Sequence, residues 1–191
     1  MKCEPKLFEN GIKVRTGEVR LSYAHLFQAH AAQPDQKEAY SAALLIPKSD
    51  TKTISLINQA IENAKQVGRE KKGWKDPVFK SPKFHNPLRD GEEKEEDEVY
   101  QNMMFVNAKS YNNQPTVLDS QKNKIEDASE VYSGCWAQAS VSFYPFDVSG
   151  NKGIACGLNG VQKTRDDEAL SGGGNAADDF EGEDEDDDFL N

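Results

Sequence analysis

The C-terminal end of this chain is too acidic to fold into a packed domain. Residues 166–191 contain 12 Asp and Glu residues and no Lys or Arg. The whole sequence has a formal net charge of −10, so residues 1–165 hold all 23 basic residues against 21 acidic ones and carry a net charge of +2. A segment with this many charged residues cannot bury enough apolar surface to offset the conformational entropy that it would lose on folding. We therefore predict one folded domain over residues 1–165 and a disordered acidic tail over residues 166–191.

The tail has two interpretations. It can act only as a solubility device. Alternatively, a tethered polyanion competes for any cationic groove on its own domain, and a groove that accepts the tail also accepts nucleic acid. Near its end, Asp187 and Asp188 precede the apolar pair Phe189 and Leu190. We expect these four residues to bind a partner protein.

Several protein classes are disfavoured. The sequence has no apolar run long enough to cross a bilayer and no signal peptide, so we expect no membrane partner and a cytoplasmic location. The cysteines, Cys3, Cys135 and Cys156, are widely spaced without a CxxC pair, which argues against a disulfide framework or a zinc ribbon. We predict neither a metal nor a cofactor.

Apolar and polar residues alternate along much of the domain, which predicts a mainly β fold. Residues 7–23 read as two extended segments, and residues 23–27 as a short helical turn. The apolar run that ends at Pro47 predicts a strand buried on both faces, in the middle of a sheet. One helix is predicted from an N-cap near Asp50 to Gly68. Further strands are expected at residues 99–109, 116–118, 134–144 and 153–163.

The strand at residues 134–144 has two distinct faces. One is apolar and is predicted to be core: Cys135, Ala137, Ala139, Val141 and Phe143. The other is a polar row with an aromatic residue at each end: Trp136, Gln138, Ser140, Ser142 and Tyr144. Three polar neighbours make core burial of Trp136 unfavourable, so we expect Trp136 to face a nucleic-acid groove or to lie under the basic segment at residues 65–89.

Residues 65–89, here called the flap, combine basic and aromatic side chains with three prolines. Such a segment is either a solvated loop with a few anchoring aromatics, or a cationic surface that supplies phosphate contacts and stacking faces. The sign of the charge reverses in the acidic run at residues 90–98. Carboxylates clustered there suggest Mg²⁺ binding in a nuclease, but contiguous acidic residues seldom converge on one ion.

Together these elements predict a small, strand-rich barrel with one helix and a long inserted loop. The sequence also resembles a family of bacteriophage single-stranded-DNA-binding proteins with an OB-fold, long catalogued as a domain of unknown function. The resemblance is carried in order by Ser22 with Tyr23, residues 40–48, residues 87–91, residues 130–134, and residues 152–159. It implies a five-stranded antiparallel barrel that coats single strands without chemistry, in phage replication or recombination in the infected host cell.

The tail resembles the acidic terminus of single-strand binders, which ends in two Asp residues and an aromatic residue. Here Leu190 and Asn191 follow Phe189. The resemblance implies replication or recombination proteins as partners of the tail.

We therefore predict a non-enzymatic protein that binds single-stranded DNA without sequence preference, as a monomer or a dimer. A metal-dependent nuclease or other replication enzyme, and an acidic decoy or chaperone for basic proteins, are the alternatives. The candidate DNA-binding residues are Arg20, Arg69, Lys71, Lys72, Trp74, Lys75, Phe79, Lys80, Lys109, Tyr111, Trp136 and Tyr144.

Overall fold

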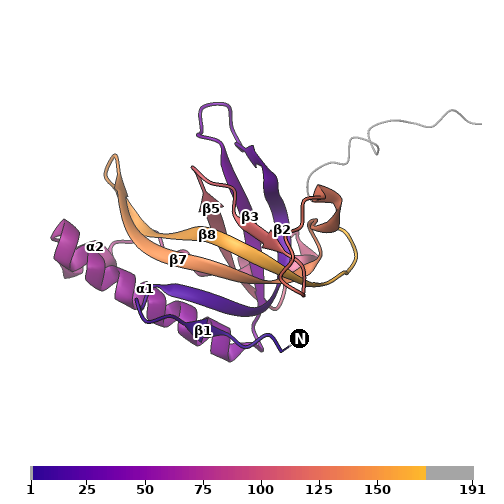
Figure 1. Cartoon of the computed structure of the whole chain (residues 1–191). Coiled ribbons are helices and arrows are strands. Elements are labelled where there is room, and N and C mark those ends of the chain that lie inside the picture. Colours follow the sequence, from indigo (N-terminus) through magenta and orange to yellow (C-terminus); the bar gives the residue numbers. More distant parts are fainter. Residues whose placement is uncertain (1, 171–191) are drawn as a thin grey trace, which may run out of the picture.

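The computed structural model of the protein describes residues 2–170 and is mainly β (Figure 1). The strands are β1 (Lys6–Leu7), β2 (Lys13–His30), β3 (Ala39–Pro47), β4 (Arg89–Asp90), β5 (Met103–Ser110), β6 (Thr116–Leu118), β7 (Trp136–Val148) and β8 (Asn151–Arg165). The helices are α1 (Thr51–Lys72) and α2 (Asp76–Lys80), with 3₁₀ turns η1 (Gly91–Glu93), η2 (Glu98–Tyr100) and η3 (Ala128–Glu130). Neither α-helix in this part of the chain has the length and apolar character needed to cross a membrane.

Five of the strands close into a barrel. They follow the order β5, β3, β2, β7 and β8 through antiparallel pairings, and a parallel contact between Lys109 of β5 and Gly157 of β8 closes the circle. Strand β2 is long enough to pair with β7 through its first half and with β3 through its second half. The predicted five-stranded barrel with one main helix is confirmed.

The barrel core is formed by the faces that the sequence pattern predicts. Ala137, Val141 and Phe143 of β7 are fully buried. Ile57 and Ala60 of α1 belong to the same apolar cluster, and α1 packs against β7 and β2. Strand β3 lies between β2 and β5, and its residues from Ala42 to Ile46 are buried, as expected for a central strand.

The second half of β2 corrects one expectation. Residues 23–27 belong to the strand rather than to a helical turn, because β2 continues to His30. A shift in the pairing with β3 falls between Ser22 and His25. There Ser22 is buried, whereas Tyr23 has a φ of 46° and is 50% exposed. A bulge of this kind adds a residue to one strand and reverses the alternation of its faces, so Tyr23 points to solvent instead of into the core.

Helix α1 begins as predicted but ends later. The Asp50 side chain accepts a hydrogen bond from the Thr53 amide at 3.0 Å, and the helix runs past Gly68 to a left-handed C-cap at Gly73. Gly68 is needed inside the helix for packing, because a Cβ there would lie 2.6 Å from the Trp74 ring. The first part of the flap is therefore helical. Residues 98–100 likewise form a 3₁₀ turn, so the following strand begins at Met103 instead of Val99.

Candidate nucleic-acid interface

Two hairpins project from the barrel on either side of β5. One is formed by β2 and β3, the other by β7 and β8, and β5 pairs with β3 and β8 between them (Figure 1). In a five-stranded barrel with this strand order, the corresponding strand face and its two flanking loops are the surface that binds oligonucleotides. We call this surface the hairpin groove and define it by seven residues: Tyr23, His25, His30, Lys37, Lys109, Tyr111 and Tyr144.

The hairpin groove contains a cavity of about 280 Å³ beside the β2–β3 hairpin. Tyr23, His25, His30, Lys37 and Lys109 are among its lining residues. The Lys37 ammonium lies 5.5 Å from the centre of the Tyr111 ring, which joins the cavity to the segment after β5. Within residues 2–170, neither Lys37 nor Lys109 takes part in an ion pair, so both charges are available to an anionic ligand.

Three tyrosines of the hairpin groove are exposed. Tyr23 is 50% exposed, Tyr111 43% and Tyr144 40%, and the described residues include only one other large apolar side chain exposed to this degree. Tyr144 lies close to β8, because a Cβ at Gly157 would be 3.4 Å from its Cε1 atom. Exposed rings beside ammonium groups that form no ion pair within residues 2–170 provide faces on which bases can stack and cations that can neutralise phosphates.

The two histidines of the groove form a stacked pair. Their ring centroids are 4.2 Å apart with an interplanar angle of 16°. Partial burial and the neighbouring His30 ring lower the pKa of His25. The positive charge of the groove near neutral pH therefore comes from its lysines rather than from His25.

Of the residues predicted from the sequence, Lys109, Tyr111 and Tyr144 meet in the hairpin groove. The sequence interpretation missed Tyr23, because it assigned residues 23–27 to a helical turn. It also missed His25, His30 and Lys37, which come together only when the β2–β3 hairpin forms. The one sequence signal for these residues was the polar character of residues 28–38, close after Tyr23. Polarity by itself does not distinguish a binding site from a solvent-exposed loop.

Trp136 and Arg20 lie at the opposite end of β7 from Tyr144. They are directly paired across β2 and β7. Within the predicted polar row, Gln138 is buried and donates a hydrogen bond to the Thr16 carbonyl at 2.8 Å. The indole is not under the flap. Its ring lies 4.4 Å from the guanidinium of Arg165, and its Nε1 donates a hydrogen bond to Asp167 at 2.8 Å.

The flap packs against the β7–β8 hairpin. Its His85 amide donates to the Lys152 carbonyl, and the Ile154 amide donates to the His85 carbonyl, both at 3.0 Å. Four predicted lysines in or beside the two helices are exposed: Lys71, Lys72, Lys75 and Lys80. Arg69 is paired with Asp76 at 2.6 Å. The flap thus carries exposed lysines and is attached to the β7–β8 hairpin through His85.

The structure corrects the expectation that Trp74 offers a stacking face. Trp74 is only 5% exposed and belongs to the core. Its ring makes edge-to-face contacts with Phe79 at 6.0 Å and with Phe84 at 5.9 Å. Phe79 is partly buried in the same cluster and is covered by the Arg69 guanidinium at 4.5 Å. These aromatics anchor the flap, because edge-to-face packing and apolar burial favour the ring positions seen here.

The acidic run at residues 90–98 makes local ion pairs. Lys48 pairs with Asp90 at 2.9 Å and with Glu92, and Arg89 pairs with Glu93 at 2.6 Å. Hydrogen bonding to the side chains of Glu92 and Lys48 lowers the pKa of Asp90. Within residues 2–170, no cluster of three or more His, Cys, Asp or Glu side chains is placed to hold a metal ion.

A five-stranded barrel whose hairpin groove carries exposed tyrosines and unpaired lysines defines the class of OB-fold nucleic-acid-binding proteins. The chain belongs to the family described as the ssDNA-binding protein of Enterobacter phage Enc34, whose sequence profile matches residues 12–190. A relative named putative protein p50, from Acyrthosiphon pisum secondary endosymbiont phage 1, is 36% identical over 173 residues, which cover 87% of this chain and 90% of that protein.

Solved structures of phage proteins share the fold. The single-stranded DNA-binding protein of bacteriophage Enc34, in complex with ssDNA, superposes with a TM-score of 0.71 at 23% identity, over 89% of this chain and 95% of that one. The single-stranded DNA-binding protein gp2.5 of bacteriophage T7 gives a TM-score of 0.60 at 14% identity, over 90% of this chain and 96% of that one. The OB-fold inferred from the sequence is therefore confirmed.

Proposed function

We propose that this protein binds single-stranded DNA in the hairpin groove without sequence preference. The observation that carries the proposal is the position of Tyr23, Tyr111 and Tyr144, three exposed rings on the face where an OB barrel receives an oligonucleotide. Every base has a π-face, so stacking on tyrosine does not discriminate between bases. Lys37 and Lys109 are placed to neutralise phosphates between the stacked bases, which makes binding dependent on salt.

The exposed lysines of the flap extend this cationic surface past the β7–β8 hairpin. They contribute charge, because the aromatic residues among them are held in the core cluster. No bond is made or broken in this function. Together with the family, this supports a protein that coats single strands during phage DNA replication or recombination in the cytoplasm of the infected host cell.

A titration with single-stranded and duplex oligonucleotides of equal length tests the proposal. We expect binding of the single strand at low salt and much weaker binding of the duplex, whose bases are already stacked on one another. Preferential binding of the duplex would contradict the proposal. Adding Mg²⁺ to the same labelled DNA is the control for the nuclease alternative, which predicts cleavage that EDTA abolishes.

We further propose that the acidic tail competes with DNA and recruits partners. The residues in question, Asp187, Asp188, Phe189 and Leu190, lie outside the described part of the chain. An apolar pair at the end of an acidic sequence suits a partner with a small apolar pocket in a basic surface.

Replacing Phe189 and Leu190 together with Ala should remove that partner and leave DNA affinity nearly unchanged, since neither residue carries charge. Affinity capture from infected cells, with parent and double variant compared, is the measurement. An identical set of captured proteins would contradict recruitment through this pair.

A further inference from the structure

The two histidines of the hairpin groove are brought together by an irregularity in β2. Residues five apart in a regular strand point to opposite faces of the sheet. Here the pairing with β3 shifts, because His25 lies opposite Ser41. His30 lies opposite Ala39, so a step of five residues along β2 matches a step of two along β3. The extra residues let both rings lie on one side, where they stack with their centroids 4.2 Å apart.

The charged side chains that line the cavity beside this pair are all basic. Lys37 lines it from the β2–β3 connection and Lys109 from β5, and the described lining residues include no Asp or Glu. Strand β3 contributes only uncharged Ala and Ser residues. The other titratable groups nearby are the hydroxyls of Tyr23, which lines the cavity, and of Tyr111, whose ring contacts Lys37.

Neither histidine has an anionic partner in the described part of the chain. Within residues 2–170, no ion pair includes His25 or His30. A nearby carboxylate is a common means of stabilising an imidazolium ion in a protein, because an opposite charge favours the charged form. The negative charge that would stabilise a protonated ring at this position must therefore come from a ligand.

Without such a ligand, the groove disfavours protonation of the pair. Two imidazolium ions stacked at this distance would repel each other. Partial burial and the adjacent His30 ring lower the pKa of His25. A phosphate group in the cavity reverses the balance, because an opposite charge within about 4–6 Å favours the charged form. Once protonated, an imidazole has a donor on each ring nitrogen and can donate a hydrogen bond to a phosphate oxygen.

We propose that the stacked pair of His25 and His30 is a phosphate site that takes up one proton when DNA binds, an assignment that rests on the proposed binding of single strands in the hairpin groove. The proton comes from water, is held on a ring nitrogen of the pair, and returns to water when the DNA leaves. Because phosphate binds the protonated pair more tightly, the pKa of the pair is higher in the complex than in the free protein. DNA affinity is therefore highest below the pKa of the free pair and lowest above the pKa of the bound pair.

The dependence of binding on pH tests this site. An oligothymidylate of about 16 nucleotides is titrated into the full chain at about pH 6 and about pH 8, at constant ionic strength, with anisotropy as the readout. Thymine bases gain no proton in this range. We expect about fivefold tighter binding at the lower pH. Calorimetry between these pH values, in two buffers of different ionisation enthalpy, should show the uptake of up to one proton per complex.

Histidine variants assign the proton. The chain has three histidines, and His25→Gln combined with His30→Gln should abolish both the proton uptake and the pH dependence. The matched control is His85→Gln, because the His85 ring lies in the flap beside Phe146, at 5.9 Å between centroids. This variant should keep the pH dependence of the parent. Melting temperatures check folding, and the proton uptake of the parent and of His85→Gln is measured even if the double variant does not fold.

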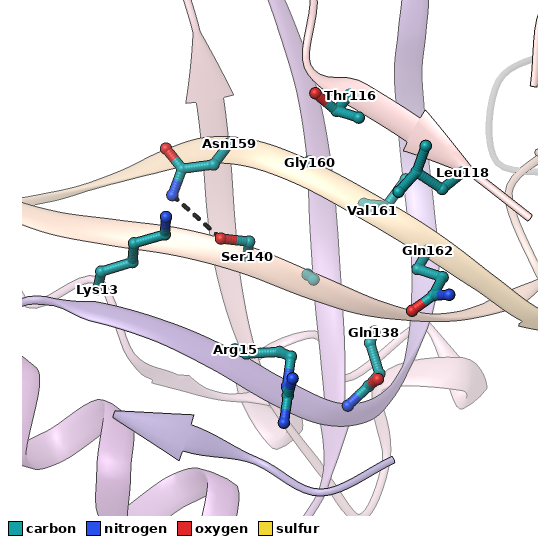
Figure 2. A pocket seen from close by; sticks show the side chains of 11 residues that line it. Lys13, Arg15, Thr116, Leu118, Gln138, Ser140, Asn159, Gly160, Val161 and Gln162 are labelled. Atoms are coloured by element: carbon teal, nitrogen blue, oxygen red, sulfur yellow. Dashed lines mark hydrogen bonds between the residues drawn. The ribbon is translucent and has the colours of Figure 1, made fainter. Parts of the chain in front are cut away.

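A second control distinguishes the loss of an imidazole from the loss of a positive charge. Figure 2 shows a cavity of about 320 Å³ over β2, β7 and β8, lined by Lys13, Arg15 and Asn159. The described lining residues of this cavity include no histidine. Lys13→Gln removes one positive charge without removing an imidazole, so the ratio of affinities at the two pH values should stay that of the parent.

The outcomes separate the histidine site from the function on which it depends. If DNA binds equally well at both pH values without proton uptake, the histidine site is wrong and the hairpin groove stands. The same holds if the double variant keeps the pH dependence, or if His85→Gln or Lys13→Gln loses it. If the oligothymidylate binds at neither pH, both the proposed function and the histidine site are wrong.

Discussion

Tyr144 belongs both to the predicted polar row of β7 and to the proposed hairpin groove. It ends the polar row of β7, is 40% exposed, and lies over Gly157 beside Lys109 in the closing pair of the barrel. Stacking on an aromatic side chain contributes about 1–3 kcal/mol per base. Tyr144→Ala should therefore weaken oligonucleotide binding roughly tenfold. Tyr144→Phe keeps the ring and should bind like the parent. Measuring both by anisotropy, with melting temperatures as a check on folding, tests whether the ring acts in binding; equal affinity of the Ala variant and the parent would remove Tyr144 from the site.

At the scale of the elements, the aromatic residues of the flap pack into the core cluster, whereas its lysines are exposed. Trp74 fills the space that Gly68 leaves on α1 and contacts Phe79 and Phe84. Trp74→Ala should lower the free energy of unfolding by about 3–5 kcal/mol, the usual cost of deleting a buried aromatic ring. Thermal or urea denaturation measures this loss. DNA affinity, measured where the variant is still folded, should stay close to that of the parent. A variant with unchanged stability and weakened DNA binding would instead place the Trp74 ring in the interface.

At the scale of the whole molecule, the proposed competition between the acidic tail and DNA is tested by truncation. Ending the chain at Leu170 removes nine of the 12 tail carboxylates and changes the net charge from −10 to −1. We expect tighter DNA binding, with the largest gain at low salt, because the Debye length falls from about 30 Å at 0.01 M to about 8 Å at 0.15 M. A variant with a full-length tail, in which amides replace the carboxylates, controls for the volume of the tail. If truncation leaves the DNA affinity unchanged at low salt, the tail does not compete with DNA.

The sequence by itself determined the buried faces of the central strands and the single main helix, and it predicts a near-neutral domain followed by an acidic C-terminal segment. These features depend on periodicity and local charge, as at Val141 and Phe143, whose burial follows from alternation alone. The tertiary structure decided the rest. A bulge turned Tyr23 outwards, helix packing buried Trp74, and barrel closure brought Lys109 beside Tyr144. Such outcomes depend on contacts between residues that are far apart in the chain. A local sequence pattern therefore does not encode which side of a sheet a bulged residue will face. Nor does it encode which aromatic residue will fill a gap beside a helix.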